Sequence, residues 1–94
     1  MSKADKLVLY TRPLCGDCQQ AKAYLNDQRI VYEHKNVEDN PTVEAELVSL
    51  TGSKIVPAFI FLKRNLLGKQ KVEKTFIGFE NKRQAIESLL LQFK

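Results

Sequence analysis

Cys15-Gly16-Asp17-Cys18 contains the only two cysteines of the 94-residue chain. An apolar run at 7–10 precedes this stretch, and a helix-forming run at 19–25 follows it. The pair is therefore predicted to lie where a strand ends and a helix begins. The first turn of a helix offers unpaired N–H groups and a partial positive charge, which favour a thiolate over a thiol. The pattern predicts a reactive thiol at this point.

The spacing of the two cysteines predicts separate roles for them. Cys15 at the mouth of the helix can face solvent, while Cys18 lies one turn along and can reach back to it. In thiol–disulfide exchange, one thiolate attacks a disulfide and a second thiol displaces it from the mixed disulfide. We predict Cys15 as the attacking thiolate and Cys18 as the buried resolving thiol.

Two structural interpretations of the pair compete with this one. A structural zinc site needs about four ligands, and His34 is the only histidine, so no metal site is expected within one chain. A structural disulfide is typical of secreted domains and closes longer loops. A metal shared between two chains remains an alternative.

Length and composition predict a single domain over residues 1–94. The chain is 44% hydrophobic, which is enough to bury a core without help from metal or disulfides. The N-terminus has no apolar signal core, and no apolar run approaches transmembrane length. We expect a cytoplasmic monomer that does not bind membranes.

The net charge of +4 is concentrated between Lys63 and Lys74, where five basic residues accompany one acidic residue, Glu73. Nucleic-acid binding would require basic residues interleaved with exposed aromatics, or a known reading motif. Neither is evident, so no nucleic-acid partner is expected. The basic segment is either a solvated hairpin or a docking patch for an acidic partner.

Apolar periodicity and turn residues predict seven elements. Strands are predicted at 6–10, 30–37, 58–62 and 72–77, and helices at 15–28, at 41–51 between Asn40 and Gly52, and after Asn81. The order is β-α-β-α-β-β-α. A hairpin turn containing Asn65 and Gly68 joins the last two strands. A short crossover makes the first two strands parallel, so the sequence predicts an α/β fold with a four-stranded mixed sheet flanked by helices.

These motifs together resemble the glutaredoxin branch of the thioredoxin superfamily over nearly the whole chain. Three anchors carry the resemblance: the segment 10–18, Val56-Pro57, and Gly78-Phe79. The resemblance implies a thioredoxin-like fold. It also implies a thiol–disulfide oxidoreductase, an electron carrier that reduces protein disulfides or glutathione mixed disulfides through Cys15 and Cys18.

The resemblance further implies a substrate groove beside the cysteines. Pro57 is expected to be a cis proline, with Val56 presenting its backbone N–H and C=O to an extended substrate. Arg12 is expected to bind a glutathione carboxylate, although a solvated loop charge is the alternative.

The far side of this groove is expected at the start of the last helix, where Gly78, Phe79 and Asn81 are expected to contact the substrate. Asn81 is expected to cap that helix, with Gln84 three residues on. In glutathione-using members the helix mouth holds the γ-glutamyl carboxylate. Phe79 follows Gly78 where those members carry a second glycine, so its bulk is expected to hinder glutathione, as is the charge of Glu80.

Gly78-Phe79 is similar to the glutaredoxin-like redoxins that reduce ribonucleotide reductase and are themselves reduced by thioredoxin reductase. The resemblance therefore implies a disulfide-bearing protein substrate and either thioredoxin reductase or glutathione as electron donor. No organic cofactor is required, because the dithiol carries the electrons.

The dipeptide Gly16-Asp17 is unusual for this family. The negative charge of Asp17 is expected to raise the pKa of Cys15, and so to bring the reduction potential below the roughly −200 to −230 mV of glutaredoxins.

Typical glutaredoxins have Pro-Tyr between the two cysteines, and Gly16 takes the place of that proline here. Some glutaredoxins without this proline bind a [2Fe–2S] cluster between two chains. An iron–sulfur carrier, and a redox-sensing module that docks through the basic hairpin, are therefore alternative functions.

Overall fold

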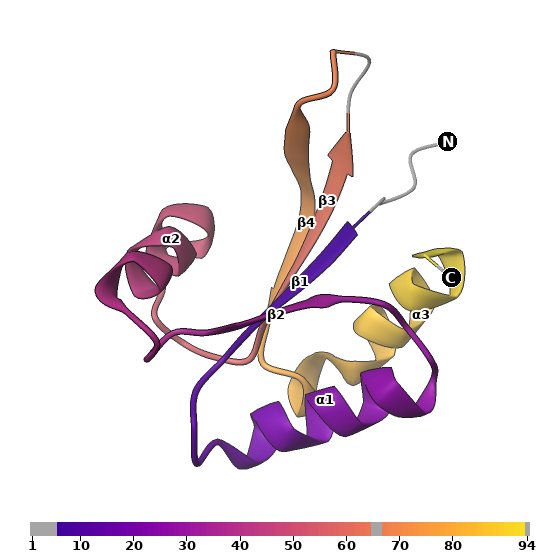
Figure 1. Cartoon of the computed structure of the whole chain (residues 1–94). Coiled ribbons are helices and arrows are strands. Elements are labelled where there is room, and N and C mark those ends of the chain that lie inside the picture. The colour runs from indigo at the N-terminus through magenta and orange to yellow at the C-terminus, as the bar shows by residue number, and fades with distance from the viewer. Residues whose placement is uncertain (1–5, 65–66, 94) are drawn as a thin grey trace.

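The computed structural model describes residues 6–64 and 67–93, with side chains up to residue 91. The elements are β1 (Lys6–Thr11), α1 (Gly16–Asp27), β2 (Glu33–Asn36), α2 (Pro41–Thr51), β3 (Ala58–Arg64), β4 (Gln70–Ile77), a 3₁₀ turn η1 (Glu80–Lys82) and α3 (Arg83–Phe93). The predicted order is confirmed, with η1 in addition (Figure 1). The predicted turn residue Asn65 lies outside the described residues. No helix within the described ranges is long and apolar enough to cross a membrane.

The four strands form one mixed sheet, as predicted, and their order in it is β2-β1-β3-β4. β1 runs parallel to β2, and β3 runs antiparallel to both β1 and β4. β2 is shorter than the predicted strand at 30–37, because the chain is still closing α1 at Ile30. The N–H of Ile30 donates to the carbonyl of Leu25 at 2.9 Å, so Ile30 is tied to the C-terminal turn that follows α1 and lies outside the strand.

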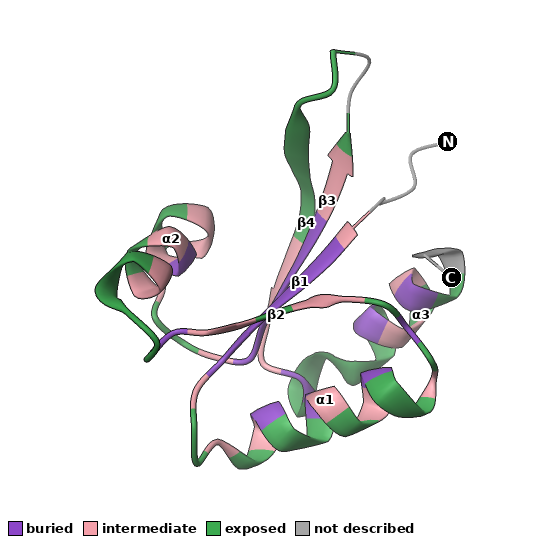
Figure 2. Cartoon of the chain, in the orientation of Figure 1, coloured by how far each residue is buried: buried purple, intermediate pink, exposed green. Residues whose placement is uncertain are grey.

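Side chains that alternate along β1 and β3 produce a core on each face of the sheet. Leu7, Leu9, Phe59 and Phe61 join α1 and α3 on one face. Val8, Tyr10, Ala58 and Ile60 join α2 on the other. Figures 1 and 2 show α2 on one side of the sheet, α1 and α3 on the other, and buried residues along the central strands.

Helix ends follow local signals at α2 but not at α3. The side chain of Asn40 accepts from the N–H of Val43 at 3.2 Å, and Gly52 ends α2 with φ of 77°, so both predicted signals for α2 are confirmed. The predicted cap at Asn81 is wrong, because Asn81 lies inside η1 and α3 begins at Arg83. The donors at this point are satisfied by a residue from another element, described below.

Candidate functional site

Cys15 is the N-cap of α1, as the sequence predicts for a reactive thiol. Its Sγ accepts a hydrogen bond from the N–H of Cys18 at 3.2 Å. The two cysteines form a disulfide, with their Cα atoms 5.2 Å apart. Cys15 is half-buried and Cys18 is fully buried. A thiolate at Cys15 would receive both this N–H and the positive end of the helix dipole.

The Val56–Pro57 peptide bond is cis, as the resemblance implies. Pro57 is buried, and its carbonyl accepts from the N–H of Gly78 at 2.7 Å. Gly78 has φ of 88°, and a Cβ at this position would lie 2.9 Å from Oδ1 of Asn81. The structure therefore brings Pro57, Gly78 and Asn81 together, with a left-handed backbone at 78 that favours glycine.

Asp17 connects the cysteine motif to this second segment. Its carboxylate accepts from the N–H of Phe79 at 2.9 Å and from the N–H of Glu80 at 3.2 Å. Asp17 thus satisfies donors at the start of η1 from 62 residues away in sequence. Sequence reasoning treats Asp17 only as a charge near the sulfurs, because no local pattern reveals a cap supplied by another element.

Phe79 lies in the core rather than in the groove. Its side chain is 1% exposed, and its ring centroid lies 5.9 Å from that of Phe59 and 5.5 Å from that of Tyr24. The ring is therefore not placed to hinder glutathione by its bulk, contrary to the expectation from the sequence. Phe79 contributes its backbone N–H to the site and its ring to the packing of α1 against the sheet.

Arg12 is held by groups of its own chain. Its guanidinium lies 3.1 Å from Oε2 of Glu44 and 3.9 Å from a carboxylate oxygen of Glu38, and it donates to the carbonyl of Lys54 at 3.0 Å. Glu44 belongs to α2, and Lys54 lies in the segment that leads to Val56. Arg12 therefore fastens the end of β1 to both of these elements.

Two exposed apolar side chains directly precede predicted site residues in the sequence. Leu14 directly precedes Cys15, is fully exposed and has φ of 58°. Ile55 directly precedes Val56 and is 61% exposed. Each of these side chains therefore offers an exposed apolar contact beside a predicted site residue, Leu14 beside Cys15 and Ile55 beside Val56.

Tyr10, Thr11 and His34 hold the strands that lead to the site. Tyr10 is buried, and burial together with a hydrogen bond to Glu46 raises the pKa of its hydroxyl. Thr11 Oγ1 lies 2.6 Å from Nε2 of His34 on the neighbouring strand. Burial, and then the charge of Lys22, lower the pKa of His34.

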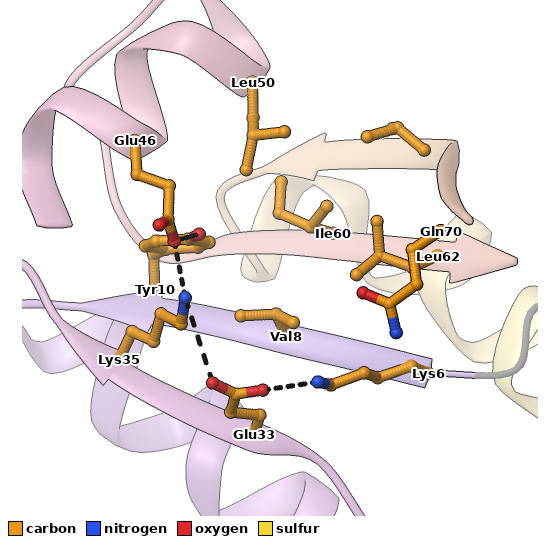
Figure 3. A pocket seen from close by; sticks show the side chains of 11 residues that line it. Lys6, Val8, Tyr10, Glu33, Lys35, Glu46, Leu50, Ile60, Leu62 and Gln70 are labelled. Carbon is orange, nitrogen blue, oxygen red and sulfur yellow. Dashed lines mark hydrogen bonds and ion pairs between the residues drawn. The ribbon is translucent and has the colours of Figure 1, made fainter. Parts of the chain in front are cut away.

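A cavity of about 300 Å³ on the α2 face lies beside Tyr10 (Figure 3). Its charged lining residues pair with one another, Lys6 with Glu33 at 2.7 Å and Lys35 with Glu46 at 2.6 Å. None of the predicted site residues lines this cavity. Across residues 6–64 and 67–93, no group of three or more His, Cys, Asp or Glu side chains is placed to hold a metal ion.

Comparison with known proteins agrees with this geometry. The Glutaredoxin family model matches residues 7–73, which is more than half of the chain. The chain belongs to the glutaredoxin family. This membership and the Cys15–Cys18 pair support thiol–disulfide oxidoreductase activity in general.

Solved glutaredoxin structures share the fold, so the predicted thioredoxin-like fold is confirmed. The glutaredoxin grx-1 from Archaeoglobus fulgidus superposes with a TM-score of 0.70 at 16% identity, covering 92% of this chain and 86% of that one. A buckwheat glutaredoxin in complex with glutathione superposes with a TM-score of 0.60 at 18% identity, covering 94% of this chain and 76% of that one.

A regulator is also similar over part of the chain. The global transcriptional regulator Spx 2 from Bacillus anthracis is 41% identical over 44 residues, which are 47% of this chain and 34% of the regulator. The chain thus spans about a third of the length of the curated relatives that it matches.

Proposed function

We propose that this glutaredoxin-family protein reduces disulfides in other proteins, with Cys15 attacking and Cys18 resolving. The placement of Cys15 carries the proposal. Its half-buried sulfur caps α1 and accepts the N–H of Cys18, while Cys18 is fully buried. A partly exposed thiolate can reach a substrate, and a buried thiol one turn along can reach only Cys15.

The reaction transfers two electrons from the dithiol to the substrate. The Cys15 thiolate attacks one sulfur of the substrate disulfide, forms a mixed disulfide, and releases the other substrate sulfur as a thiolate that takes a proton from water. Cys18 then loses its proton to solvent and attacks the Sγ of Cys15. This step releases the second substrate thiol and leaves the Cys15–Cys18 disulfide. An external donor of two electrons returns the pair to the dithiol.

We favour thioredoxin reductase as this donor, with glutathione as the alternative. Gly78-Phe79 supports the first through its similarity to redoxins that reduce ribonucleotide reductase. Proposed residue roles are substrate binding by Val56 and Pro57, and support of the groove by Arg12, Gly78 and Asn81. A cytoplasmic monomer that needs no organic cofactor remains our expectation.

Turnover of insulin disulfides tests the proposal with two electron sources run side by side. One source is NADPH with thioredoxin reductase, and the other is glutathione with glutathione reductase. We expect activity with the first source and loss of it in Cys15→Ser and in Cys18→Ser. Wild-type protein that reduces insulin with neither source would contradict the proposal.

The likeness to Spx 2 supports a second candidate, a redox-sensing interaction module. Such a module would keep its partner when both cysteines are changed to serine, and it would show no turnover. An iron–sulfur carrier is a third candidate; a colourless protein after anaerobic reconstitution with iron and sulfide would remove it.

A further inference from the structure

We propose that Asp17 and Glu44 make the site selective for disulfides without carboxylates, such as those of proteins, over small carboxylate-bearing disulfides such as oxidised glutathione. The proposal rests on the function proposed above and specifies its substrate class. Two sets of groups, one bonded to Asp17 between the cysteines and one on Arg12, three residues before Cys15, are suited to hold a carboxylate of a substrate. The chain's own carboxylates occupy both sets.

The first set is the pair of backbone N–H groups at Phe79 and Glu80. Each donates to a different oxygen of Asp17, at 2.9 and 3.2 Å. Two N–H groups that converge on one carboxylate form charge-assisted hydrogen bonds. Asp17 stands between Cys15 and Cys18 in α1, so this pair of donors lies at the redox centre and is already satisfied there.

The second set is the guanidinium of Arg12. It contacts Glu44 at 3.1 Å and donates to the carbonyl of Lys54 at 3.0 Å. A planar guanidinium is the side chain best matched to a carboxylate. Here α2 supplies that carboxylate, and the side chain of Arg12 is only 30% exposed.

Two exposed apolar side chains adjoin predicted site residues in the sequence. Leu14, directly before Cys15, and Ile55, directly before Val56, present their side chains to solvent. A protein disulfide can bury apolar neighbours against these residues. Oxidised glutathione carries four carboxylates and would meet the negative charges of Asp17, Glu44 and Glu80 instead.

The test is a selectivity ratio measured in single turnovers. Pre-reduced protein is mixed anaerobically with oxidised glutathione or with bis(2-hydroxyethyl) disulfide, which is neutral, then quenched by alkylation and analysed by mass spectrometry. The ratio of the two rate constants cancels any change in the reactivity of Cys15 itself. We expect wild-type protein to favour the neutral disulfide.

We expect Asp17→Ala to shift this ratio toward oxidised glutathione about tenfold, which corresponds to about 1.4 kcal/mol. Glu44→Ala should shift the ratio in the same direction by only about threefold. The shift is smaller because Arg12 would still donate to the carbonyl of Lys54 and would be only partly freed. Asp17→Asn keeps an acceptor for the N–H groups but loses the charge, and Glu80→Gln loses a neighbouring charge without freeing the N–H groups. Both controls should shift the ratio less than Asp17→Ala.

The outcomes separate this proposal from the function on which it rests. Wild-type protein that reacts with neither disulfide nor with insulin would contradict the function itself. If wild-type protein reacts with the neutral disulfide, but neither Asp17→Ala nor Glu44→Ala changes the ratio, the selectivity proposal is overturned and the function stands. Equal shifts in Asp17→Ala and the two controls would also overturn it, because charge alone would then explain the selectivity. Should Asp17→Ala fail to fold, Glu44→Ala and Asp17→Asn decide between the same outcomes.

Discussion

Asp17 exerts two effects on the neighbouring cysteines. Its negative charge disfavours a thiolate at Cys15, and its hydrogen bonds to the N–H groups of Phe79 and Glu80 hold the first turn of α1 in place. The same two bonds spread part of the charge of the carboxylate. We therefore expect the charge of Asp17 to have only a moderate effect on the Cys15 thiolate. We also expect its two hydrogen bonds to contribute to the stability of the fold.

Replacement of Asp17 by asparagine separates these effects. Asp17→Asn should lower the pKa of Cys15 and raise the reduction potential by roughly 10–30 mV, because the reduced form loses a repulsion; 30 mV is about 1.4 kcal/mol. Thiolate absorbance against pH and equilibration with redox buffers measure the two quantities. A potential that falls, or an unchanged pKa of Cys15, would show that the charge of Asp17 does not control the thiolate.

A side chain at position 78 is predicted to destabilise the fold. Gly78→Ala should lower the free energy of unfolding by roughly 1–3 kcal/mol, because φ of 88° is strained for alanine and the new Cβ would lie 2.9 Å from Oδ1 of Asn81. Urea denaturation measures the change. Gly16→Ala is the matched control, since nothing lies within 4 Å of a Cβ there, and a loss of stability equal to that of Gly78→Ala would contradict this account.

At the scale of elements, the hairpin of β3 and β4 places like charges opposite one another. Lys63 pairs directly with Lys71, and the register shifts between Phe61 and Leu62. Like charges in directly opposed positions destabilise a sheet. Lysines also discourage other chains from pairing with an edge strand such as β4. The basic segment predicted from the sequence is thus a hairpin, and its role in docking remains a prediction.

Reversal of one charge should stabilise this hairpin. Lys71→Glu is expected to raise the free energy of unfolding by about 0.5 kcal/mol at low salt, because a repulsion becomes an attraction across the strands. In 1 M salt the gain should nearly vanish, since the Debye length falls to about 3 Å. Lys71→Gln serves as a control that should give a smaller gain, and a gain independent of salt would point to packing instead of charge.

The contact between Thr11 and His34 joins β1 to β2 and should respond to pH. The pKa of His34 is lowered on folding, first by burial and then by Lys22. At His34 the unfolded chain therefore binds a proton more readily than the folded chain does. The contribution of neutral His34 to the free energy of unfolding is complete above about pH 6.5, the ordinary pKa of histidine, and is lost as the pH falls below that value. His34→Gln should flatten this part of the stability curve, measured by urea denaturation from pH 5 to 8. A decline of the same steepness in His34→Gln would assign the dependence to carboxylates.

At the scale of the whole molecule, Phe79 connects the site to the core. Its ring contacts Tyr24 of α1 and Phe59 of β3, while its backbone N–H binds Asp17. Packing of the core and geometry of the site therefore depend on one residue. A change at Phe79 should affect both together.

A truncation of this ring should destabilise the fold. Phe79→Leu is expected to lower the free energy of unfolding by about 1–2 kcal/mol, and Phe79→Ala by about 3–5 kcal/mol, because the smaller side chains leave a cavity. Leu14→Ala, at a fully exposed position, should change it by less than about 0.5 kcal/mol. Chemical denaturation gives all three values, and equal costs at 14 and 79 would refute the buried placement of Phe79.

The sequence alone determined those features that depend on neighbours along the chain. The apolar runs predicted the strands, and Asn40 and Gly52 marked the ends of α2 because capping is a contact between residues a few positions apart. The apolar run before Cys15 and the helix-forming run after Cys18 predicted their position at the mouth of α1, and these runs are also neighbours along the chain. The order of the elements then led to the mixed sheet.

Only the tertiary structure decided what the charged and aromatic residues of the groove contact. Asp17 caps η1 across 62 positions of sequence, Arg12 reaches Glu44 on α2, and Phe79 turns into the core. A carboxylate or guanidinium takes whichever partner folding brings near it, and that partner leaves no periodic trace in the sequence. The sequence therefore located the reactive thiols, whereas the groups that select a substrate became apparent only once distant elements were packed together.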